Sequence, residues 1–206
     1  MTSILKADTI QDTDGNNIIN ESGNTITIGA SGDTISIPSG ATIANSGTAT
    51  GFGGITMAQQ WRLSSDLVGD ANPITSNLEV VDTDGYGGIG SGMSESSGTF
   101  TFPSTGIYLI NFNITQQVTA SGDYAQGIIQ TTTNNSSYSS AADGRTNSSG
   151  TGTAFNSAVA SFMFDVTDTS THKVQFRAVQ ANTGNKLVGN SSSNVTYMTF
   201  IRLGDT

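Results

Sequence analysis

Few residues in this chain have side chains that could catalyse a reaction or hold a metal. His172 is the only histidine and there is no cysteine, so one chain cannot build a zinc site from these residue types. A catalytic triad would have to use His172, and no nucleophile motif points to it. We expect His172 to lie exposed in a turn; a cluster of three copies on a threefold axis is the alternative.

Carboxylates recur in three close pairs, Asp12/Asp14, Asp82/Asp84 and Asp165/Asp168. Glycosidases use two carboxylates several ångströms apart, so a polysaccharide-cleaving enzyme is one alternative. Each pair, however, lies in a turn-like stretch, where aspartate bends the backbone by hydrogen-bonding to it. The first pair has the start of a calcium loop, but the distant bidentate glutamate is missing. We therefore predict turn aspartates, with no catalytic residue, no metal and no cofactor, and we do not expect an enzyme.

The composition favours strands and turns over helices. Charged residues make up 11% of the chain, against about 25% in an average soluble domain, and Gly, Ser, Thr and Asn are abundant. Ser, Thr and Asn compete with helix formation by bonding to nearby backbone groups, whereas Thr, Val, Ile and aromatic residues favour strands. The net charge of −9 and the seven scattered basic residues argue against nucleic acid and anionic lipid as partners. No apolar run approaches the roughly 20 residues that span a bilayer, so we expect no membrane insertion.

The first 54 residues have the pattern of a thin β stalk. Short apolar bursts alternate with glycine-containing turns, at Ile18-Ile19, Thr25–Ile28, Thr34–Ile37 and Ala41–Ile43. Alternation of Thr or Ser with Ile is typical of a strand with one buried face, but one or two Ile per burst cannot bury a core within one chain. We expect three chains to wind together so that each Ile meets its copies, the alternative being a disordered linker. The glycines from Gly47 to Gly54 would form a hinge.

Residues 55–206 contain almost all the aromatic residues and the long alternations of an all-β head. The predicted strands are Thr99–Phe102, Gly106–Thr115, Tyr124–Thr131, Ala154–Val166, Lys173–Gln180 and Asn194–Leu203, with a short strand near 137–142. Turn sequences separate the strands and no segment has a helical period, which is typical of an antiparallel sandwich or jelly roll. The residues expected in the core are Tyr108, Ile110, Phe112, Phe162, Phe176 and Tyr197.

A short motif links the head to a known family. Its matching positions are Gly98, Phe100, Pro103, Gly106 and Tyr108. They resemble the Gly-x-Phe-x-x-Pro-x-x-Gly-x-Tyr pattern of the jelly-roll head shared by the first complement component and tumour necrosis factor. Proline fixes φ at the turn and glycine accepts a positive φ, so the motif makes physical sense between two strands. The resemblance implies a jelly roll that assembles as a threefold trimer. The family's late Gly-Asp pair is replaced here by Asp168–His172, so the calcium-linked role of some members does not carry over.

The N-terminal segment Leu5–Gly15 resembles the openings of bacteriophage tail-fibre and other virion proteins, in which such an opening precedes a Ser/Gly/Ile-rich stalk. The resemblance implies that the chain docks on a virion through Leu5, Lys6, Asp8, Thr9 and Ile10. No charged-then-apolar signal segment opens the sequence, which fits a virion protein made in the bacterial host cytoplasm and released by lysis.

Strand counting predicts where the loops of the head lie. If the stalk enters at one end, the base, and the last strand ends there too, the links at about 119–122, 143–152 and 182–193 lie at the opposite end, the tip. The residues expected to contact a receptor there are Ser121, Asp143, Arg145, Asn147, Asn182, Asn185, Lys186 and Asn190. With little apolar surface, these loops suit hydrogen bonding to sugars or polar protein groups.

These features favour a virion fibre or spike, a homotrimer whose head binds a glycan or protein on the host surface. Linked copies compensate for weak single contacts, because they rebind at a high effective concentration. The main alternative is a capsid-decorating protein that stabilises the shell without binding a receptor. A bacterial adhesin or matrix protein is a third interpretation, which a signal peptide would favour.

Overall fold

A computed structural model of the 206-residue chain describes residues 9–11, 13–15, 17–23, 25–44, 54–120, 122–148 and 152–206. In these residues every regular element is a β-strand and every strand pair is antiparallel, as the composition and patterning predicted. The chain separates into two compact units, residues 1–50 and 51–206, which we call the N-terminal unit and the head. The described part of the chain contains no helix long and apolar enough to cross a membrane.

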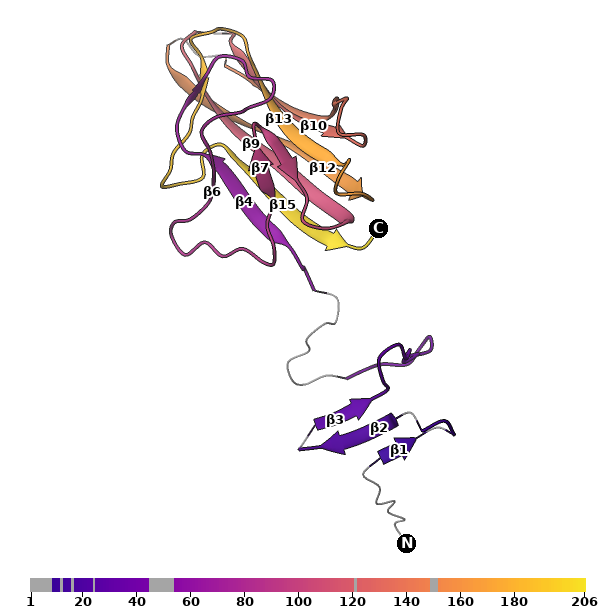
Figure 1. The fold of residues 1–206 in the computed structure, drawn as a ribbon. Helices are drawn as coiled ribbons and strands as arrows, with labels where there is room; N and C mark the ends of the chain where they lie inside the picture. Colours follow the sequence, from indigo (N-terminus) through magenta and orange to yellow (C-terminus); the bar gives the residue numbers. More distant parts are fainter. Residues whose placement is uncertain are drawn as a thin grey trace. The chain divides into compact units, whose positions relative to one another are not determined.

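The N-terminal unit contains a three-stranded antiparallel sheet (Figure 1). Its strands, in spatial order, are β1 (Thr9–Gln11), β2 (Asn17–Ser22) and β3 (Thr25–Ile28). The later bursts, Thr34–Ile37 and Ala41–Ile43, form no strand in this single chain. Every isoleucine in the described part of the unit is exposed, from 37% for Ile19 to 68% for Ile26. Within this unit the sheet has no second layer among the described residues, so these side chains lack the apolar cover that burial requires.

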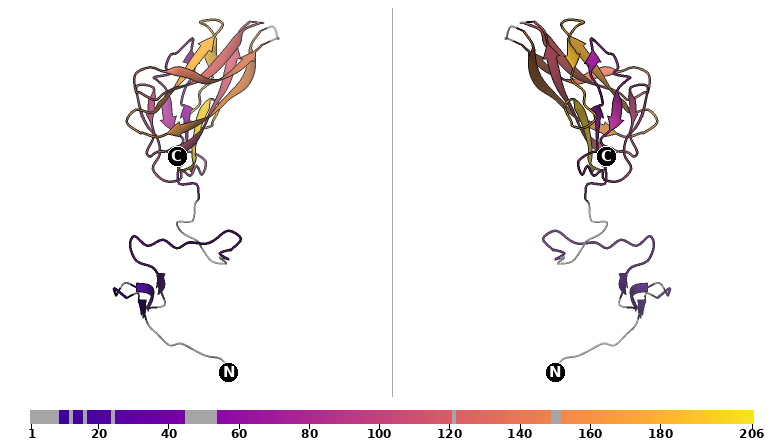
Figure 2. Two further views of the ribbon diagram at one scale, coloured as in Figure 1. Left: turned by 90° about the vertical axis from the view of Figure 1, so that its right-hand side faces the viewer. Right: turned by 90° about the vertical axis from the view of Figure 1, so that its left-hand side faces the viewer.

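The head is a sandwich of two antiparallel sheets (Figures 1 and 2). The small sheet has the order β11-β10-β13-β8-β7, with β7 (Ser94–Ser96), β8 (Thr99–Thr101), β10 (Tyr124–Thr132), β11 (Ser139–Asn147) and β13 (Lys173–Gln180). The large sheet has the order β5-β14-β9-β15-β4-β6, with β12 paired to β9 on the flank that β15 does not occupy. Its strands are β4 (Ala58–Leu63), β5 (Leu67–Val68), β6 (Leu78–Val80), β9 (Gly106–Val118), β12 (Ala154–Val166), β14 (Lys186–Leu187) and β15 (Tyr197–Gly204).

The core lies between the two sheets. Strand β9 alternates buried and half-buried residues over its 13 positions, so that Tyr108 and Phe112 point inward with no exposed surface. From the small sheet, Phe176 packs its ring centroid 5.0 Å from that of Phe112, and Phe100 lies 5.3 Å from Phe176. Gly127 faces the same cluster, and a Cβ there would collide with the Phe112 ring. The absent side chain therefore lets the small sheet approach β9 closely.

The turn between β8 and β9 is built as its motif predicted. Gly106, where β9 begins, has a φ angle of 142°, and Gly98, in the turn just before β8, has a φ angle of 82°; both values favour glycine. The Tyr108 hydroxyl donates a hydrogen bond to the Ser104 carbonyl at 2.9 Å, which ties the start of β9 to the turn before it. The motif therefore combines a tight connection with an aromatic residue anchored in the core.

The first and last residues of the head lie at one end, which we call the base. The Arg202 backbone N–H donates to the Met57 carbonyl at 2.9 Å, and Gly204 pairs with Ile107. Val166 pairs with Gly106, so the 167–172 link is also at the base. The opposite end, where β9 finishes at Val118, is the tip.

The structure confirms part of the predicted core and corrects the rest. Buried as expected are Tyr108, Ile110, Phe112 and Phe176. Phe162 is half-buried and packs against the core cluster. Tyr197 is half-buried and faces outward, whereas Met198 and Phe200 face the core, so the predicted register of the last strand is wrong by one residue. Both sides of this strand are apolar, and alternation alone therefore could not choose between them. The expected exposure of His172 is also wrong, because its ring stacks on Phe164 with 5.6 Å between centroids and only 9% of the residue is exposed.

Candidate binding surfaces

The outward side of the large sheet carries exposed apolar side chains on neighbouring strands. On β12, Phe155, Val159 and Met163 are 62%, 56% and 65% exposed, and Leu203 on β15 is also exposed. They point outward because the residues that alternate with them, such as Phe164, face the core. We call the outward side chains of β9, β12 and β15 the apolar face.

Cross-strand pairing joins the apolar face into rows. Two of these rows are Met163–Leu109–Ile201 and Val159–Asn113–Tyr197. Strand β9 contains no charged residue, and β12 contains one, Asp165. The row between these two is polar and uncharged, Ser161–Asn111–Thr199. Exposed apolar side chains on neighbouring strands, with few charges among them, suit association with another protein surface.

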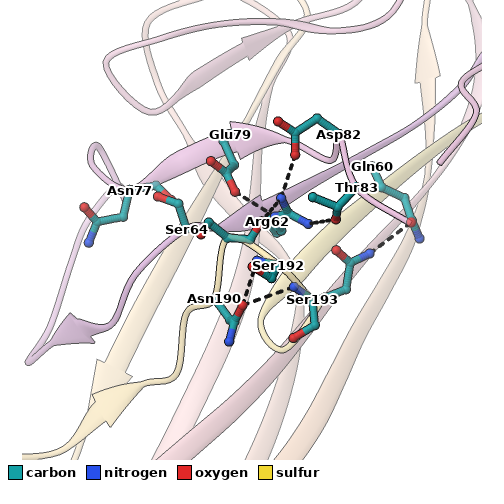
Figure 3. Close-up of polar contacts among 12 residues, drawn as sticks. Gln60, Arg62, Ser64, Asn77, Glu79, Asp82, Thr83, Asn190, Ser192 and Ser193 are labelled. Atoms are coloured by element: carbon teal, nitrogen blue, oxygen red, sulfur yellow. Dashed lines mark hydrogen bonds and ion pairs between the residues drawn. The ribbon is translucent and has the colours of Figure 1, made fainter. Parts of the chain in front are cut away.

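Beside the apolar face, a buried arginine fastens two links of the chain to the large sheet (Figure 3). Arg62 is 1% exposed and donates from Nε to Glu79 at 2.7 Å, from Nη2 to Asp82 at 2.8 Å and from Nη1 to Thr83 at 2.9 Å. Its Nη2 also donates to the carbonyl of Ser191. Because all three guanidinium nitrogens are engaged, this corner is a structural clamp and does not offer a free cation to a ligand.

Asp82, Asp84 and Asp168 serve turns or an ion pair, whereas Asp165 lies within strand β12, so its predicted place in a turn is wrong. Asp168 accepts hydrogen bonds from the hydroxyl and the backbone N–H of Ser170, and these bonds hold the pKa of its carboxyl below the usual range. Asp84 occupies a turn with a φ of 56°, and Asp82 binds Arg62. The described residues contain no group of three or more His, Asp or Glu side chains placed to hold a metal.

The outward side of the small sheet differs from the apolar face in charge. The charged residues of β10, β11 and β13 are Asp143, Arg145, Lys173 and Arg177. Three of these four are basic, in a chain with seven basic and 16 acidic residues, but Lys173 is buried and donates to Thr101 and Thr169, so Arg145 and Arg177 are the basic residues that this surface offers. The register places Asp143 opposite Ile128, and Ile128 opposite Arg177, so these strands form one continuous surface. We call the outward side chains of β10, β11 and β13 the polar face.

Neighbouring side chains hold Arg145 in position on the polar face. Its Nε donates to Asp143 Oδ2 at 2.5 Å, and Gln126 Nε2 donates to the same oxygen at 2.8 Å. These two hydrogen bonds, that from Arg145 foremost, hold the pKa of the Asp143 carboxyl below its usual range. The Arg145 side chain is 72% exposed, and its two terminal nitrogens have no hydrogen-bond partner among the described residues.

A hollow of about 370 Å³ opens beside Arg145. The residues that line it are Tyr124, Gln126, Arg145, Thr146 and Asn147. Strands β10 and β11 build it, because their register sets Tyr124 opposite Asn147 and Gln126 opposite Arg145. Tyr124 is 45% exposed. An exposed aromatic ring surrounded by hydrogen-bonding groups suits a small polar ligand.

Two of the predicted receptor-contact residues, Arg145 and Asn147, line this hollow, and a third, Asp143, bonds to Arg145; none of the three lies in a loop. Asp143 and Arg145 lie within strand β11, which continues to Asn147 because it pairs with β10 as far as Tyr124. The predicted short strand near 137–142 was therefore too short. Ser121 lies outside the described residues.

Asn185 lies in a polar interior at the tip, whereas Asn182 is exposed and bonds to the buried Asp123 there. Asn182 Nδ2 donates to Asp123 Oδ1 at 2.5 Å. Asn185 is 0% exposed, contrary to the surface position that we expected. Buried side-chain atoms without a protein partner in the described residues include both amide atoms of Gln116 and Asn185, Asp123 Oδ2, Ser148 Oγ, Asn156 Nδ2 and Gln180 Oε1. Asn185 therefore belongs to the packing of the tip and not to its surface.

Lys186 and Asn190 make contacts within the head. Lys186 forms an ion pair with Asp66 at 2.5 Å, and this hydrogen bond lowers the pKa of the Asp66 carboxyl. The Asn190 side-chain oxygen accepts hydrogen bonds from the backbone N–H groups of Ser192 and Ser193, which shapes the link before β15 (Figure 3). Neither residue lies at the hollow.

Only part of the predicted docking segment can be placed. Leu5, Lys6, Asp8 and Asp12 lie outside the described residues. Thr9 and Ile10 belong to β1, and Ile10 is exposed. Their role in docking remains a prediction.

The apolar face, the role of Arg62 and the contribution of Tyr124 and Gln126 were not predicted from the sequence. The apolar face had a signal, because β12 alternates apolar residues on both sides and a strand of that kind is typically covered on both. No signal in the sequence predicts the hollow, since it depends on the register between β10 and β11.

Comparisons with known proteins bear on the head. No protein-family model matches the chain, and no curated protein sequence matches it. Among solved structures, murine APRIL at pH 5.0 superimposes with a TM-score of 0.52 at 12% identity, covering 71% of this chain and 98% of that one. Eiger TNF from S. frugiperda superimposes with a TM-score of 0.53 at 12% identity, covering 74% of this chain and 95% of that one. At such low identity the likeness shows the fold alone: the head is a jelly roll of the tumour necrosis factor type, as its motif implied.

Proposed function

We propose that the chain is a non-enzymatic, homotrimeric adhesive protein of a virion, whose N-terminus docks on the particle and whose head binds a component of the host surface. The observation that carries the proposal is the contrast between the two outward faces of the head. The apolar face suits contact with copies of the same chain, and the polar face is left free to bind a second molecule.

Self-association is supported in both units. Phe155, Val159 and Met163 would leave water on association, and burial of apolar area stabilises a complex by roughly 25 cal/mol per Å² before the costs of association. The exposed isoleucines of the N-terminal unit would gain cover in the same way. Closed cyclic symmetry lets one chain satisfy both surfaces with copies of itself, and a threefold axis suits a fibre.

The virion role is supported by the sequence. The segment Leu5–Gly15 and the Ser/Gly/Ile-rich residues after it have the order of docking segment and stalk found in phage fibres. An adhesive head needs exposed polar side chains in a fixed geometry, and the polar face provides Arg145 and Tyr124 on paired strands.

Sedimentation equilibrium of the full-length protein tests the assembly. We expect three times the 21.2 kDa chain mass at micromolar concentration. A monomeric mass under these conditions would remove the trimer from the proposal.

Adsorption of the labelled protein to host bacterial cells tests the adhesive role, with antibody labelling of purified virions as the companion measurement. We expect saturable adsorption and labelled particles. Labelled particles without adsorption would instead support a capsid-decorating protein, and absence from the particle would overturn the virion role.

A further inference from the structure

We propose that the hollow bordered by Tyr124 and Arg145 binds an acidic saccharide. This inference rests on the proposed function, because it names the class of host-surface component that the head would hold. It is carried by four properties of the polar face: an available guanidinium, an exposed aromatic ring, amide groups in register, and a local excess of positive charge.

The neighbours of Arg145 orient its guanidinium group but engage only one of its three nitrogens. Asp143 engages its Nε, while Gln126 binds the same carboxylate oxygen and fixes that contact from the other strand. The two terminal nitrogens keep their N–H donors without a partner in the described residues. A planar guanidinium with free donors is suited to bind a carboxylate with two parallel hydrogen bonds.

The ring of Tyr124 supplies the apolar part of the site. Tyr124 pairs with Asn147 across β10 and β11, so an aromatic ring and an amide lie side by side at one edge of the hollow. A sugar ring has both C–H groups and hydroxyls, so it can pack on an exposed aromatic ring while its hydroxyls bond to neighbouring polar groups. Gln126, Thr146 and Asn147 provide donors and acceptors for those hydroxyls.

The charge around the hollow favours an anion. Arg177 lies on the next strand, β13, and makes no hydrogen bond or ion pair with a described residue. Asp143 is the one acidic residue in β10, β11 and β13, and its charge is already offset by Arg145. In a chain with a net charge of −9, this local reversal of sign would attract a negatively charged ligand to one face.

The hollow has the size and position that such a ligand needs. Its volume of about 370 Å³ is within the usual range of small-ligand sites, about 300–1,000 Å³. It lies on the outward side of the small sheet, so association through the apolar face of the large sheet leaves it open. A trimer would then present three equivalent sites, which suits weak contacts to a repetitive polysaccharide.

Calorimetric titration of the full-length protein with defined sugars tests the site. The probes are an oligogalacturonate, its methyl ester, which lacks the charge, and sialyllactose, with hexaglutamate as an acidic peptide. We expect at least one acidic sugar to bind and the methyl ester to bind at least tenfold more weakly. Arg145→Ala and Tyr124→Ala should each weaken binding at least tenfold, Arg145→Lys should weaken it less, and Ser139→Ala on the same strand should leave it unchanged.

Absence of binding to both acidic sugars, or unchanged affinity in Arg145→Ala with a native trimer mass, would overturn the proposal. Equal binding of hexaglutamate would also overturn it, in favour of an acidic peptide ligand. Adsorption to host cells separates this proposal from the proposed function. If wild-type protein and both alanine variants adsorb equally, adhesion stands and this site is wrong; if wild-type protein binds the acidic sugar but does not adsorb, the site stands and adhesion is wrong.

Discussion

The two outward faces of the head belong to the same sandwich but differ in almost every property. The apolar face exposes Phe155, Val159 and Met163, and its central strand β9 carries no charge. The polar face carries Arg145 and Arg177 within a sheet of the same antiparallel type. The inward sides of both sheets are alike, because they share one core. The difference in polarity between the outward faces therefore reflects what each face contacts. In our account, the apolar face serves assembly and the polar face serves ligand binding.

The largest expected effect comes from placing charge on the apolar face. Val159→Glu with Met163→Glu would bury two carboxylates per chain against neighbouring copies, which is costly without partners. We expect complete loss of the trimer at micromolar concentration, measured by sedimentation. Ser139→Glu, at an exposed position of β11, is the control and should remain trimeric.

Truncation of a core aromatic residue should destabilise the folded chain itself, whereas truncation of an aromatic residue on the apolar face should mainly weaken association. Phe112→Ala removes a ring with no exposed surface and should cost about 3–5 kcal/mol of unfolding free energy. Phe155→Ala removes a ring that is exposed in the single chain, so it should act mainly through association. In denaturant melts, the destabilisation by Phe155→Ala should depend on protein concentration much more than that by Phe112→Ala. Equal concentration dependence would contradict the assignment of the two rings.

Removal of an arginine should destabilise the fold on the large sheet but not on the small one. Arg62→Ala would leave Glu79 and Asp82 without their shared donor, and we expect a loss of about 2 kcal/mol, since hydrogen bonds to charged groups contribute roughly 1.5–3 kcal/mol. Arg145→Ala, on the polar face, should change unfolding by no more than about 0.5 kcal/mol. Similar losses for both variants in chemical denaturation would show that Arg145 is structural.

The smallest effect is the acid sensitivity of the ion pair between Lys186 and Asp66. The pKa of Asp66 is lowered in the folded protein, so the pair stabilises the fold above the unfolded-state pKa and loses this effect as the pH falls through the lower folded-state value. Both groups are partly exposed, so we expect at most about 1 kcal/mol. Asp66→Asn should melt earlier than wild type at pH 7 and match it near pH 2. A difference that persists at pH 2 would have another cause.

The strands of the head were largely predictable, whereas its surfaces were not. Ala154–Val166 and Lys173–Gln180 match the predicted bounds, because each has a clear two-residue period between turn sequences. The last strand was found but placed with the wrong face inward, since Tyr197 and Met198 are both apolar and only the packing of β15 between β9 and β4 decides between them. Arg145 was selected as a polar contact, but its pairing with Gln126 depends on a register that sequence spacing does not reveal.

Hydroxyl-radical footprinting of the full-length protein at micromolar concentration tests the central contrast most directly. In a single chain Met163 is more exposed than Tyr124, at 65% against 45%, and thioethers oxidise readily. Our account predicts that assembly reverses this order of exposure: Met163 should be protected several-fold relative to the unfolded chain, while Tyr124 remains modified. Oxidation of Met163 at the rate of the unfolded chain, in protein that retains its folded spectrum, would show that the apolar face is not an assembly surface.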